Sequence, residues 1–499
     1  MLVAVAWEAR IWPRRFARTL GTTCLLSSLA LAGCEHLARP SPWKIAQDPV
    51  PTEDNSVRLL FAAAEPAPTD SWERGADEPP NTLHLSLADA IEIALQGNPR
   101  LRKARAGIEK ARGGEQVAFA PFLPEVGLTN RIGTVSGNLS PGPPGPAGGI
   151  VGLGDSMHDF IQTELQVQWM IYDFGRTSGR YRQALTRERI AELLYTRARE
   201  TVAFDAAAGL LQGLLTAALK TVQEEAIRAA DSTLKDSRVR RAAGVADRDD
   251  VLRAEVQASE VREAWILARE AELAALARLN NVLGRNAALP LKLVDPKSEP
   301  PLTNTLSQSL EIAARQRPEV AIAQEAVAAA RFGRDAAAAD FKPKIYVRGS
   351  VGYVDGRNIL DGYQEGVALH LDQPLYRGGQ RLGELRSADA EIAEATASAQ
   401  ALLDQISLEV TLAFRSAGAA RARIQLARPA VAEAEENLRL VRTRYRNGNA
   451  TPTDIADAES TSTRARQRFQ VATYDYLIAL ARLDYAIGNP PALSLGSAP

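Results

Sequence analysis

Cysteine and histidine are scarce in this 499-residue sequence. Cys24 and Cys34 both lie in the first 34 residues, so the body of the chain can hold neither a disulfide framework nor a thiolate metal cluster. The four histidines lie far apart in the sequence, at His36, His84, His158 and His370. A zinc site or a histidine-based catalytic triad would have few residues to draw on, so we expect no catalytic residue, metal or cofactor.

An excess of charge of one sign is also missing. Lys and Arg number 59 and Asp and Glu number 60, which gives a net charge of −1. Nucleic-acid binding rests on clustered excess positive charge, so we expect no nucleic-acid partner. Aromatic residues make up only 6% of the chain. Together with abundant alanine, this favours long, closely packed helices over a bulky globular core.

The first 82 residues are predicted to be an export signal and a tether. Several arginines precede a short apolar stretch, residues 20–31, that is too short to span a bilayer. The stretch ends in Leu31-Ala-Gly-Cys34, which is typical of a lipoprotein signal (residues 1–33) cleaved before a lipidated Cys34. An ordinary secretory signal with a chance cysteine is the alternative. Residues 34–82 are rich in proline and lack apolar periodicity, which predicts a tether. We see no later 18-residue apolar span and expect no transmembrane helix.

The rest of the chain contains one pattern twice. Matching residues are 219 apart at the start of each copy, as in Glu92 and Glu311, and 204 apart later, as in Tyr172 and Tyr376. The change of offset falls where the first copy carries a loop-like Pro/Gly segment, residues 140–149. Such self-similarity indicates an internal duplication. We therefore predict repeats at 83–300 and 301–489, followed by a short tail at 490–499.

Each repeat is predicted to contain two strands. They lie at about 123–133 and 160–173 in the first repeat, and at about 344–354 and 364–376 in the second. Apolar and polar residues alternate along them. The apolar row contains Leu165, Val167, Trp169, Val347, Val351, Leu369 and Leu371. Aromatic residues occur near the strand ends, as the interfacial belt of a membrane barrel would require. They are Phe122, Phe160, Trp169, Tyr172, Phe174, Tyr363 and Tyr376.

The alternation has two interpretations. A half-buried sheet of a soluble protein would show it, and so would an outer-membrane barrel with its apolar face in lipid. Four strands cannot close a barrel, because the smallest closed barrels need about eight. An open strand edge is not tolerated in lipid. If the strands are in a membrane, several chains must therefore share one barrel.

Long helical hairpins are predicted at about 177–284 and 380–488. No proline occurs between Ala147 and Leu289, and a helix of some 65 residues would be about 100 Å long. Turns are expected around Gly244 and Gly448. In the second repeat, Pro429 falls inside the long helix and predicts a kink or a break there.

Several motifs in this order resemble the TolC-like outer-membrane efflux protein family. They are Leu85–Pro99, Pro121-Phe-Leu-Pro124, Tyr172-Asp-Phe-Gly-Arg176, Pro374–Gly379, and Tyr445-Arg-Asn-Gly448 followed by Asp454. The resemblance implies a mostly α-helical fold with a small β part. Duplicated helical hairpins would form a periplasmic barrel, and four strands per chain would join a 12-stranded outer-membrane β-barrel in a homotrimer. The lipoprotein motif adds similarity to the lipidated multidrug-efflux branch.

The resemblance implies the function of a passive exit duct. The channel would conduct substrates from a periplasmic adaptor protein and an inner-membrane pump to the exterior, in a tripartite efflux or type I secretion system. It would sit in outer-membrane lipid, extend into the periplasm and carry a lipid anchor at Cys34. The alternative from another class is a soluble or lipid-anchored periplasmic coiled-coil adaptor or scaffold.

The resemblance also implies site residues at the turns between the long helices. Asp454 and Asp457, with Asp250 in the first repeat, match the acidic rings of a periplasmic gate, whereas Ala450 stands where the family has a basic residue. The turns would dock the adaptor through Gly244, Val245, Gly448 and Asn449. Thr451-Pro-Thr-Asp454 is also a capping-box pattern. Helix capping is therefore as good an interpretation as the gate for Asp454 and Asp250. For Asp457 it is a weaker alternative to the gate.

Overall fold

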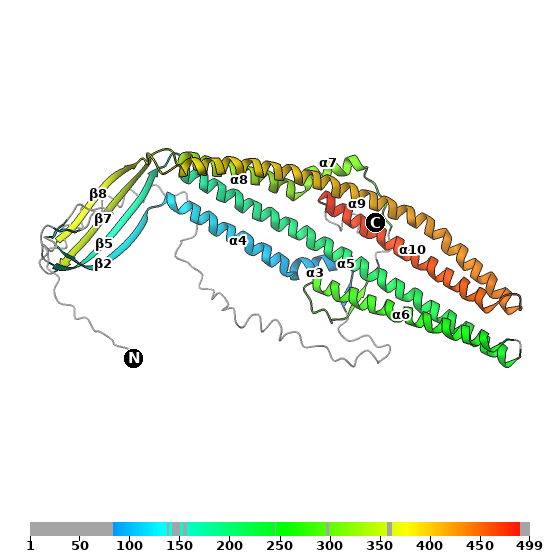
Figure 1. Ribbon diagram of the computed structural model, residues 1–499. Coiled ribbons are helices and arrows are strands. Elements are labelled where there is room, and N and C mark those ends of the chain that lie inside the picture. Colours follow the sequence, from blue (N-terminus) through cyan, green and yellow to red (C-terminus); the bar gives the residue numbers. More distant parts are fainter. Residues whose placement is uncertain are drawn as a thin grey trace, which may run out of the picture. The chain divides into compact units, whose positions relative to one another are not determined.

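A computed structural model describes residues 83–136, 139–141, 150–152, 157–244, 246–295, 299–356 and 362–489 (Figure 1). All of them belong to one of the chain's two compact units, Pro68–Pro499. The predicted signal peptide (1–33), most of the predicted loop at 140–149 and the predicted tail (490–499) lie outside the described residues. So do the tether (34–82), Cys34 and Val245.

The helices begin at matching residues in the two repeats and end within one residue of each other. In the first repeat they are α3 (Leu87–Gly97), α4 (Pro99–Phe119), α5 (Arg176–Ala242) and α6 (Arg248–Val282). In the second they are α7 (Leu306–Gln316), α8 (Pro318–Ala339), α9 (Gln380–Arg446) and α10 (Pro452–Ile487). The duplicated helical hairpins are therefore confirmed. Below, two residues are called equivalent when they are 219 apart, from α3 to the first strand of a repeat, or 204 apart, from the second strand onward.

Local sequence explains where these helices start. Ser86 and Thr305 each form a capping box at the start of α3 and α7. Pro99 and Pro318 occupy the first turn of α4 and α8, where the missing N–H costs nothing. Short 3₁₀ helix η2 (Ala120–Phe122) then leads into the first strand.

Four antiparallel strands form one sheet in the order β2-β5-β7-β8. They are β2 (Glu125–Ser136), β5 (Met157–Tyr172), β7 (Lys344–Gly356) and β8 (Gly362–Asp372). The sheet lies at the end of the long helices opposite to their two turns (Figure 1). The prediction of four strands is confirmed. β8 ends at 372 rather than 376, because Pro374 has no N–H for a strand ladder.

The two hairpins of the sheet share one register. Glu125 pairs with Gln168, and their equivalents Lys344 and Asp372 also pair. The first hairpin is extended by a short antiparallel pair, β3 (Leu139–Pro141) and β4 (Ile150–Gly152), around the inserted segment. The insertion therefore lengthens the loop without changing how the strands pair.

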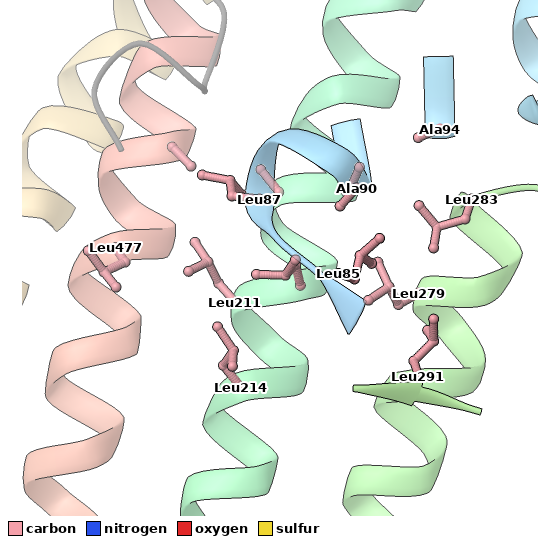
Figure 2. Close-up of a cluster of buried hydrophobic side chains, with 14 of the residues drawn as sticks. Leu85, Leu87, Ala90, Ala94, Leu211, Leu214, Leu279, Leu283, Leu291 and Leu477 are labelled. Atoms are coloured by element: carbon pink, nitrogen blue, oxygen red, sulfur yellow. The ribbon is translucent and has the colours of Figure 1, made fainter. Parts of the chain in front are cut away.

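The main apolar core forms where α3, α5, α6 and α10 meet (Figure 2). Leu85, Leu210, Leu211 and Leu279 are fully buried there. A parallel pair of three-residue strands, β1 (Leu83–Leu85) and β6 (Leu291–Leu293), joins the two ends of the first repeat beside this core. These short strands were not predicted from the sequence.

One expectation about the helices is wrong, and a second is wrong in one of its two alternatives, because α9 has no break at Pro429. α5 does contain an 18-residue window of mean hydropathy 1.6, so an apolar span of that length exists after residue 34. More than half of the window is buried inside the protein, which identifies it as a core segment. α9 also continues through Pro429 without a break. It packs along α10, and Ile424 and Ala434 are buried on either side of the proline.

A partly buried ionic cluster ties the two repeats together. The Arg197 side chain on α5 stacks on the ring of Tyr485 and pairs with Glu319 on α8, with Nε and Oε1 2.6 Å apart. Arg317, whose side chain is 3% exposed, pairs with Glu319 at 2.7 Å and with Glu409 on α9 at 2.8 Å. Buried charges need such partners, because an unpaired one would destabilise the fold by several kcal/mol.

Two carboxylates of this cluster are expected to affect stability in opposite directions. Burial raises the pKa of Glu200 above 4.5 despite its pairing with Arg197. Burial also acts to raise the pKa of Glu319, but the hydrogen bond from Arg317 and the charge of Arg197 outweigh it and lower the pKa. Ionised Glu200 therefore destabilises the fold at neutral pH, and this cost disappears as the pH falls through its raised pKa towards 4.5. Ionised Glu319 instead contributes stability, which is lost as the pH falls below 4.5.

Thermal unfolding between pH 4 and 8 measures this contrast. Glu200→Gln should leave the melting temperature unchanged or higher at pH 7, with the difference from the parent shrinking towards pH 4.5. Glu319→Gln should lower the melting temperature at pH 7. If Glu200→Gln lowers the melting temperature at pH 7 as much as Glu319→Gln does, the two carboxylates do not affect stability in opposite directions.

Candidate functional site

One face of the sheet is an exposed apolar surface. The strand pairing aligns Leu128, Leu165 and Val351 across three strands, and Trp169 with Val347 and Leu369. The exposed apolar side chains of this face include Val126, Leu128, Ile132, Ile161, Leu165, Val167, Trp169, Val351, Val367, Leu369 and Leu371. The predicted apolar row thus forms one continuous surface. Glu365 on β8 lies in the same row, next to Tyr363.

The opposite face of the sheet is polar and less exposed. Gln162 and Glu164 are buried, and Arg348 donates a hydrogen bond to Gln168 Oε1 at 2.7 Å. Phe160 belongs to this face, because it shares the parity of Gln162 and contacts Gly133. It therefore cannot be part of an aromatic belt on the apolar face, as its position near a strand end had suggested.

Aromatic residues border the apolar face at both ends. Trp169 Nε1 donates to the carbonyl oxygen of Phe122 at 2.9 Å, and the rings of Tyr172 and Phe174 are 4.6 Å apart near the helices. At the far end the rings of Tyr353 and Tyr363 are 5.0 Å apart. Eight residues separate Ile345, which pairs with Tyr172, from Tyr353, so the band is about 26 Å long along the strand. Because the strands of outer-membrane barrels tilt by about 35–45°, this length corresponds to a band about 20 Å tall, a few ångström less than the usual apolar height of about 25 Å.

The turns between the long helices are exposed and built on glycine. Gly244 and Gly448 have φ of +74° and +78°, a conformation that residues with a side chain rarely adopt. Asn449 N donates to the carbonyl oxygen of Arg444 at 2.8 Å and closes the end of α9. These two turns, residues 243–246 and 447–450, are called the tips below.

Asp454 and Asp250 cap helices. Asp454 Oδ2 accepts hydrogen bonds from the backbone N and the hydroxyl of Thr451, both at 2.8 Å, which holds the pKa of Asp454 below its usual value. Asp250 forms the equivalent capping box with Asp247 in α6. The capping alternative therefore applies to both residues, although the exposed Asp454 carboxylate still faces solvent.

Asp457 has a different environment. It lies one turn further into α10 and is exposed. It lines a cavity of about 240 Å³ between α5, α6 and α10, together with Arg253 and Thr233. Its carboxylate is thus available to ions or partners at the tips.

The two hairpins are held together just above the tips by the last turn of α9. Tyr445 is 3% exposed, and its hydroxyl lies 3.2 Å from Ser237 Oγ on α5. The Arg240 guanidinium lies 4.2 Å from the centroid of the Tyr445 ring. It also donates to the carbonyl oxygens of Tyr445 and, at 3.0 Å, Arg446. Ser237, Arg240 and Tyr445 are called the latch below.

Two further contacts reinforce this junction. The buried Glu459 on α10 accepts from Arg442 Nη2 and from Thr233 Oγ1, each at 3.0 Å. Arg466 on α10 pairs with Glu225 on α5 and, at 2.8 Å, with Glu435 on α9. The hairpins are therefore joined by several polar bonds near the tips.

Sequence reasoning missed Ser237, Arg240 and the role of Tyr445. Tyr445 appears in the Tyr-Arg-Asn-Gly motif, where a large aromatic residue one turn before an exposed turn could have signalled a buried contact. Ser237 and Arg240 follow no motif. Arg240 places positive charge at the end of α9 from the opposite hairpin, so Ala450 does not leave the tips without a basic residue.

The sequence pattern of the outer membrane efflux protein family matches residues 90–285 and 310–489. The chain belongs to this family. It is 30% identical to Protein CyaE of Bordetella pertussis over 370 residues, which cover 71% of this chain and 72% of CyaE. It is 23% identical to the outer membrane efflux protein BepC of Brucella suis, over 68% of this chain and 71% of BepC.

Solved structures of efflux channels share the fold. The crystal structure of CusC superimposes with a TM-score of 0.70 over 84% of this chain and 96% of CusC, at 17% identity. That of VceC from Vibrio cholerae gives 0.67 over 81% of this chain and 96% of VceC, at 22% identity. As a member of the outer membrane efflux family, the chain is an outer-membrane channel protein whose helices extend into the periplasm.

Mutation can separate helix capping from the ion attraction that the sequence predicts at the tips of this efflux protein. Thr451→Ala removes the cap but keeps the Asp454 carboxylate, and it should reduce stability by about 1 kcal/mol without changing ion preference. Asp457→Asn should leave the melting temperature unchanged and reduce the preference for cations. Thermal unfolding and reversal potentials in planar bilayers measure the two effects. If Thr451→Ala changes the ion preference and Asp457→Asn does not, the separation between the capping role and the ion-attracting role is wrong.

Proposed function

We propose that three chains assemble into a passive exit duct. The observation that supports this is the four-stranded sheet, which exposes an apolar face. In the described part of the chain, β2 and β8 each have one unpaired edge. An unpaired edge is costly in lipid, and closing the sheet removes it. Three copies give 12 strands, within the range of closed outer-membrane barrels. An exposed apolar face of this extent is not expected on a soluble scaffold.

The helices would then continue the barrel as a periplasmic tunnel. α5 and α9 each have 67 residues and are about 100 Å long, which suits a conduit that crosses most of the periplasm. Transport needs no turnover in such a duct, so we propose that the protein is not an enzyme. The driving force would come from an inner-membrane pump.

The tips would form the periplasmic gate. Asp454 and Asp457 from each of three chains would surround a narrow opening, where clustered carboxylates attract cations and resist anions. The latch would keep the opening narrow at rest. The gate would therefore combine an acidic ring with packing between the hairpins.

The tips would also dock a periplasmic adaptor. Gly244, Gly448 and Asn449 are exposed at the end farthest from the sheet (Figure 1), where a partner from the inner membrane would arrive; Val245 completes the proposed contact. A lipid at Cys34 would add a second attachment to the outer membrane, as in the lipidated multidrug-efflux branch. Exchanging Asn449 for a photoreactive residue in cells that carry a candidate adaptor and pump tests the docking. Crosslinking to the adaptor is expected there and not from mid-helix Gln400.

The mass of the detergent-extracted particle tests the assembly. Light scattering corrected for bound detergent should give three times the mass of one mature chain, from the outer-membrane fraction only. A monomer or dimer that is soluble without detergent would contradict the duct and favour a periplasmic scaffold.

A further inference from the structure

We propose that each chain binds one anionic phospholipid where the sheet meets the long helices (Figure 1). The site consists of Tyr172 at the end of β5, Phe174 between β5 and α5, and Lys342 between α8 and β7. These three residues are called the lipid site below. The inference rests on the outer-membrane location of the chain and not on the number of chains in the proposed duct.

Phe174 has a backbone conformation that favours glycine. Its φ is +57°, and it is the one non-glycine residue with a positive φ in the part of the chain that the structure describes. Its equivalent in the second repeat, Gly378, has a φ of +56°. Both repeats need the left-handed conformation here, but only the second uses the residue that adopts it without strain. A side chain kept under such strain points to a function of that side chain.

The start of α5 imposes this conformation on Phe174. Asp173 is buried, and its carboxylate accepts hydrogen bonds from the backbone N of Thr177, at 2.8 Å, and from the Thr177 hydroxyl. Gly175 follows with a φ of +104° and precedes the first helical residue. Because the cap at Asp173 holds the turn, the turn does not depend on the Phe174 ring.

The exposed Phe174 ring holds a cation at the border of the apolar band. The rings of Tyr172 and Phe174 are 4.6 Å apart in an edge-to-face arrangement. Lys342 Nζ lies 5.9 Å from the centroid of the Phe174 ring. A cation within about 6 Å of an aromatic face is attracted to it. The ring therefore positions the Lys342 ammonium beside the apolar face.

Lys342 lacks a counter-charge. It is exposed, and within the described residues it pairs with no carboxylate. Asp340, two residues earlier, is taken by Arg176 at 3.0 Å and by Lys344 at 3.5 Å. The Asp173 carboxylate is engaged in the cap of α5. The Lys342 ammonium is thus available to an anion from outside the chain.

The second copy of this junction lacks both features. The equivalent of Lys342 is Leu123, although the flanking phenylalanine and proline are the same in both repeats. The equivalent of Phe174 is Gly378. The ring and the ammonium are therefore present together in one copy and absent together in the other, which gives one site per chain. Arg377 is an exposed cation beside Gly378, but that turn has no ring at the equivalent position.

A phospholipid of the periplasmic leaflet fits the lipid site. Trp169 and Ile171 are exposed next to it and offer apolar surface for acyl chains. The helices extend into the periplasm from this end of the sheet, so a headgroup phosphate of that leaflet would meet the Lys342 ammonium. An anionic headgroup gains most, because a zwitterionic one carries its own cation. At the far end of the same face, the exposed Asp355 and Glu365 are acidic, so a basic border is not general to the band.

Lipid retention by the purified full-length protein tests the lipid site. The protein is exchanged into lipid-free detergent, incubated with phosphatidylglycerol or phosphatidylcholine, and weighed by native mass spectrometry. The parent should retain one phosphatidylglycerol per chain and several-fold less phosphatidylcholine. Lys342→Gln and Phe174→Gly should each lower the retention of phosphatidylglycerol several-fold.

Phe174→Gly also separates lipid binding from folding. Glycine adopts this φ without strain, as Gly378 does, so the melting temperature in lipid-free detergent should be unchanged or higher. If the ring served only packing, the variant would melt at a lower temperature and retain phosphatidylglycerol like the parent.

Arg377→Gln is the matched control, because it removes an exposed cation from the equivalent turn. It should retain phosphatidylglycerol like the parent. If Arg377→Gln loses the lipid as much as Lys342→Gln does, or if Lys342→Gln loses none, the lipid site is wrong. Equal retention of both lipids by the parent, or retention of neither, would also overturn it. Because retention is counted per chain, the result stands apart from whether the extracted particle is a trimer.

Discussion

Val167→Arg is expected to remove the protein from the outer membrane. Val167 pairs with Val126 and Gly349, near the middle of the apolar band and away from the free sheet edges. A charge on the lipid face costs about 2–4 kcal/mol at mid-bilayer, and a trimer would carry three. Most of the protein should therefore fail to insert and be degraded. Membrane fractionation and immunoblotting of the trimer band measure the loss.

The neighbouring residue provides the matched control. Gln166 differs by one position and lies on the polar face, which would line the water-filled interior. Gln166→Arg should leave insertion and trimer yield close to the parent value. Equal recovery of Val167→Arg and Gln166→Arg in the outer membrane would contradict the assignment of the two faces.

Arg240→Ala is expected to open the periplasmic end. The substitution removes the contact with the Tyr445 ring and two bonds to the last carbonyls of α9. Bonds from a charged donor are each worth about 1.5–3 kcal/mol. Loss of the latch should favour separated hairpins and raise conductance several-fold. Planar-bilayer recording measures the change.

Two further variants sharpen this test. Tyr445→Phe removes only the bond to Ser237 and should have a smaller effect than Arg240→Ala. Arg444→Ala removes an exposed arginine at the equivalent position of the second repeat and should leave conductance unchanged. A folded Arg240→Ala trimer that conducts like the parent would show that the latch does not hold the gate.

The repeated pattern made much of this fold predictable. The turns of the long hairpins were predicted from Gly244 and Gly448, and the structure places both turns there. Local sequence explains the helix starts at Pro99 and Pro318, but these starts were not predicted. The apolar face was predicted from the alternation along the strands, because successive side chains of a strand point to opposite faces of the sheet. The aromatic Phe160 was misjudged because nearness to a strand end does not decide which face a side chain occupies.

Other features depend on packing that local sequence does not encode. The latch joins residues about 205 positions apart and exists only because α5 packs beside the second hairpin. The apolar window of α5 was not recognised in the sequence, and the structure shows that α3, α6 and α10 pack against it. At Pro429, contacts with α10 on both sides outweigh the local tendency to break the helix.

The acidic residues at the tips show how one residue type can have two roles. Asp454 matched both a gate and a capping pattern, and its bonds with Thr451 show that the cap is formed. A cap leaves part of the carboxylate in solvent, so capping does not exclude a place in an acidic ring. Asp457 lies beyond the first turn of α10 and takes part in no capping box. It is the better single probe of the ring.

Single-channel recording of the purified protein in planar bilayers tests whether it is an exit duct. We expect discrete, small, cation-preferring conductance steps for the parent protein and larger steps for Arg240→Ala. If neither protein produces steps, although both are trimers in detergent, the protein is not an exit duct.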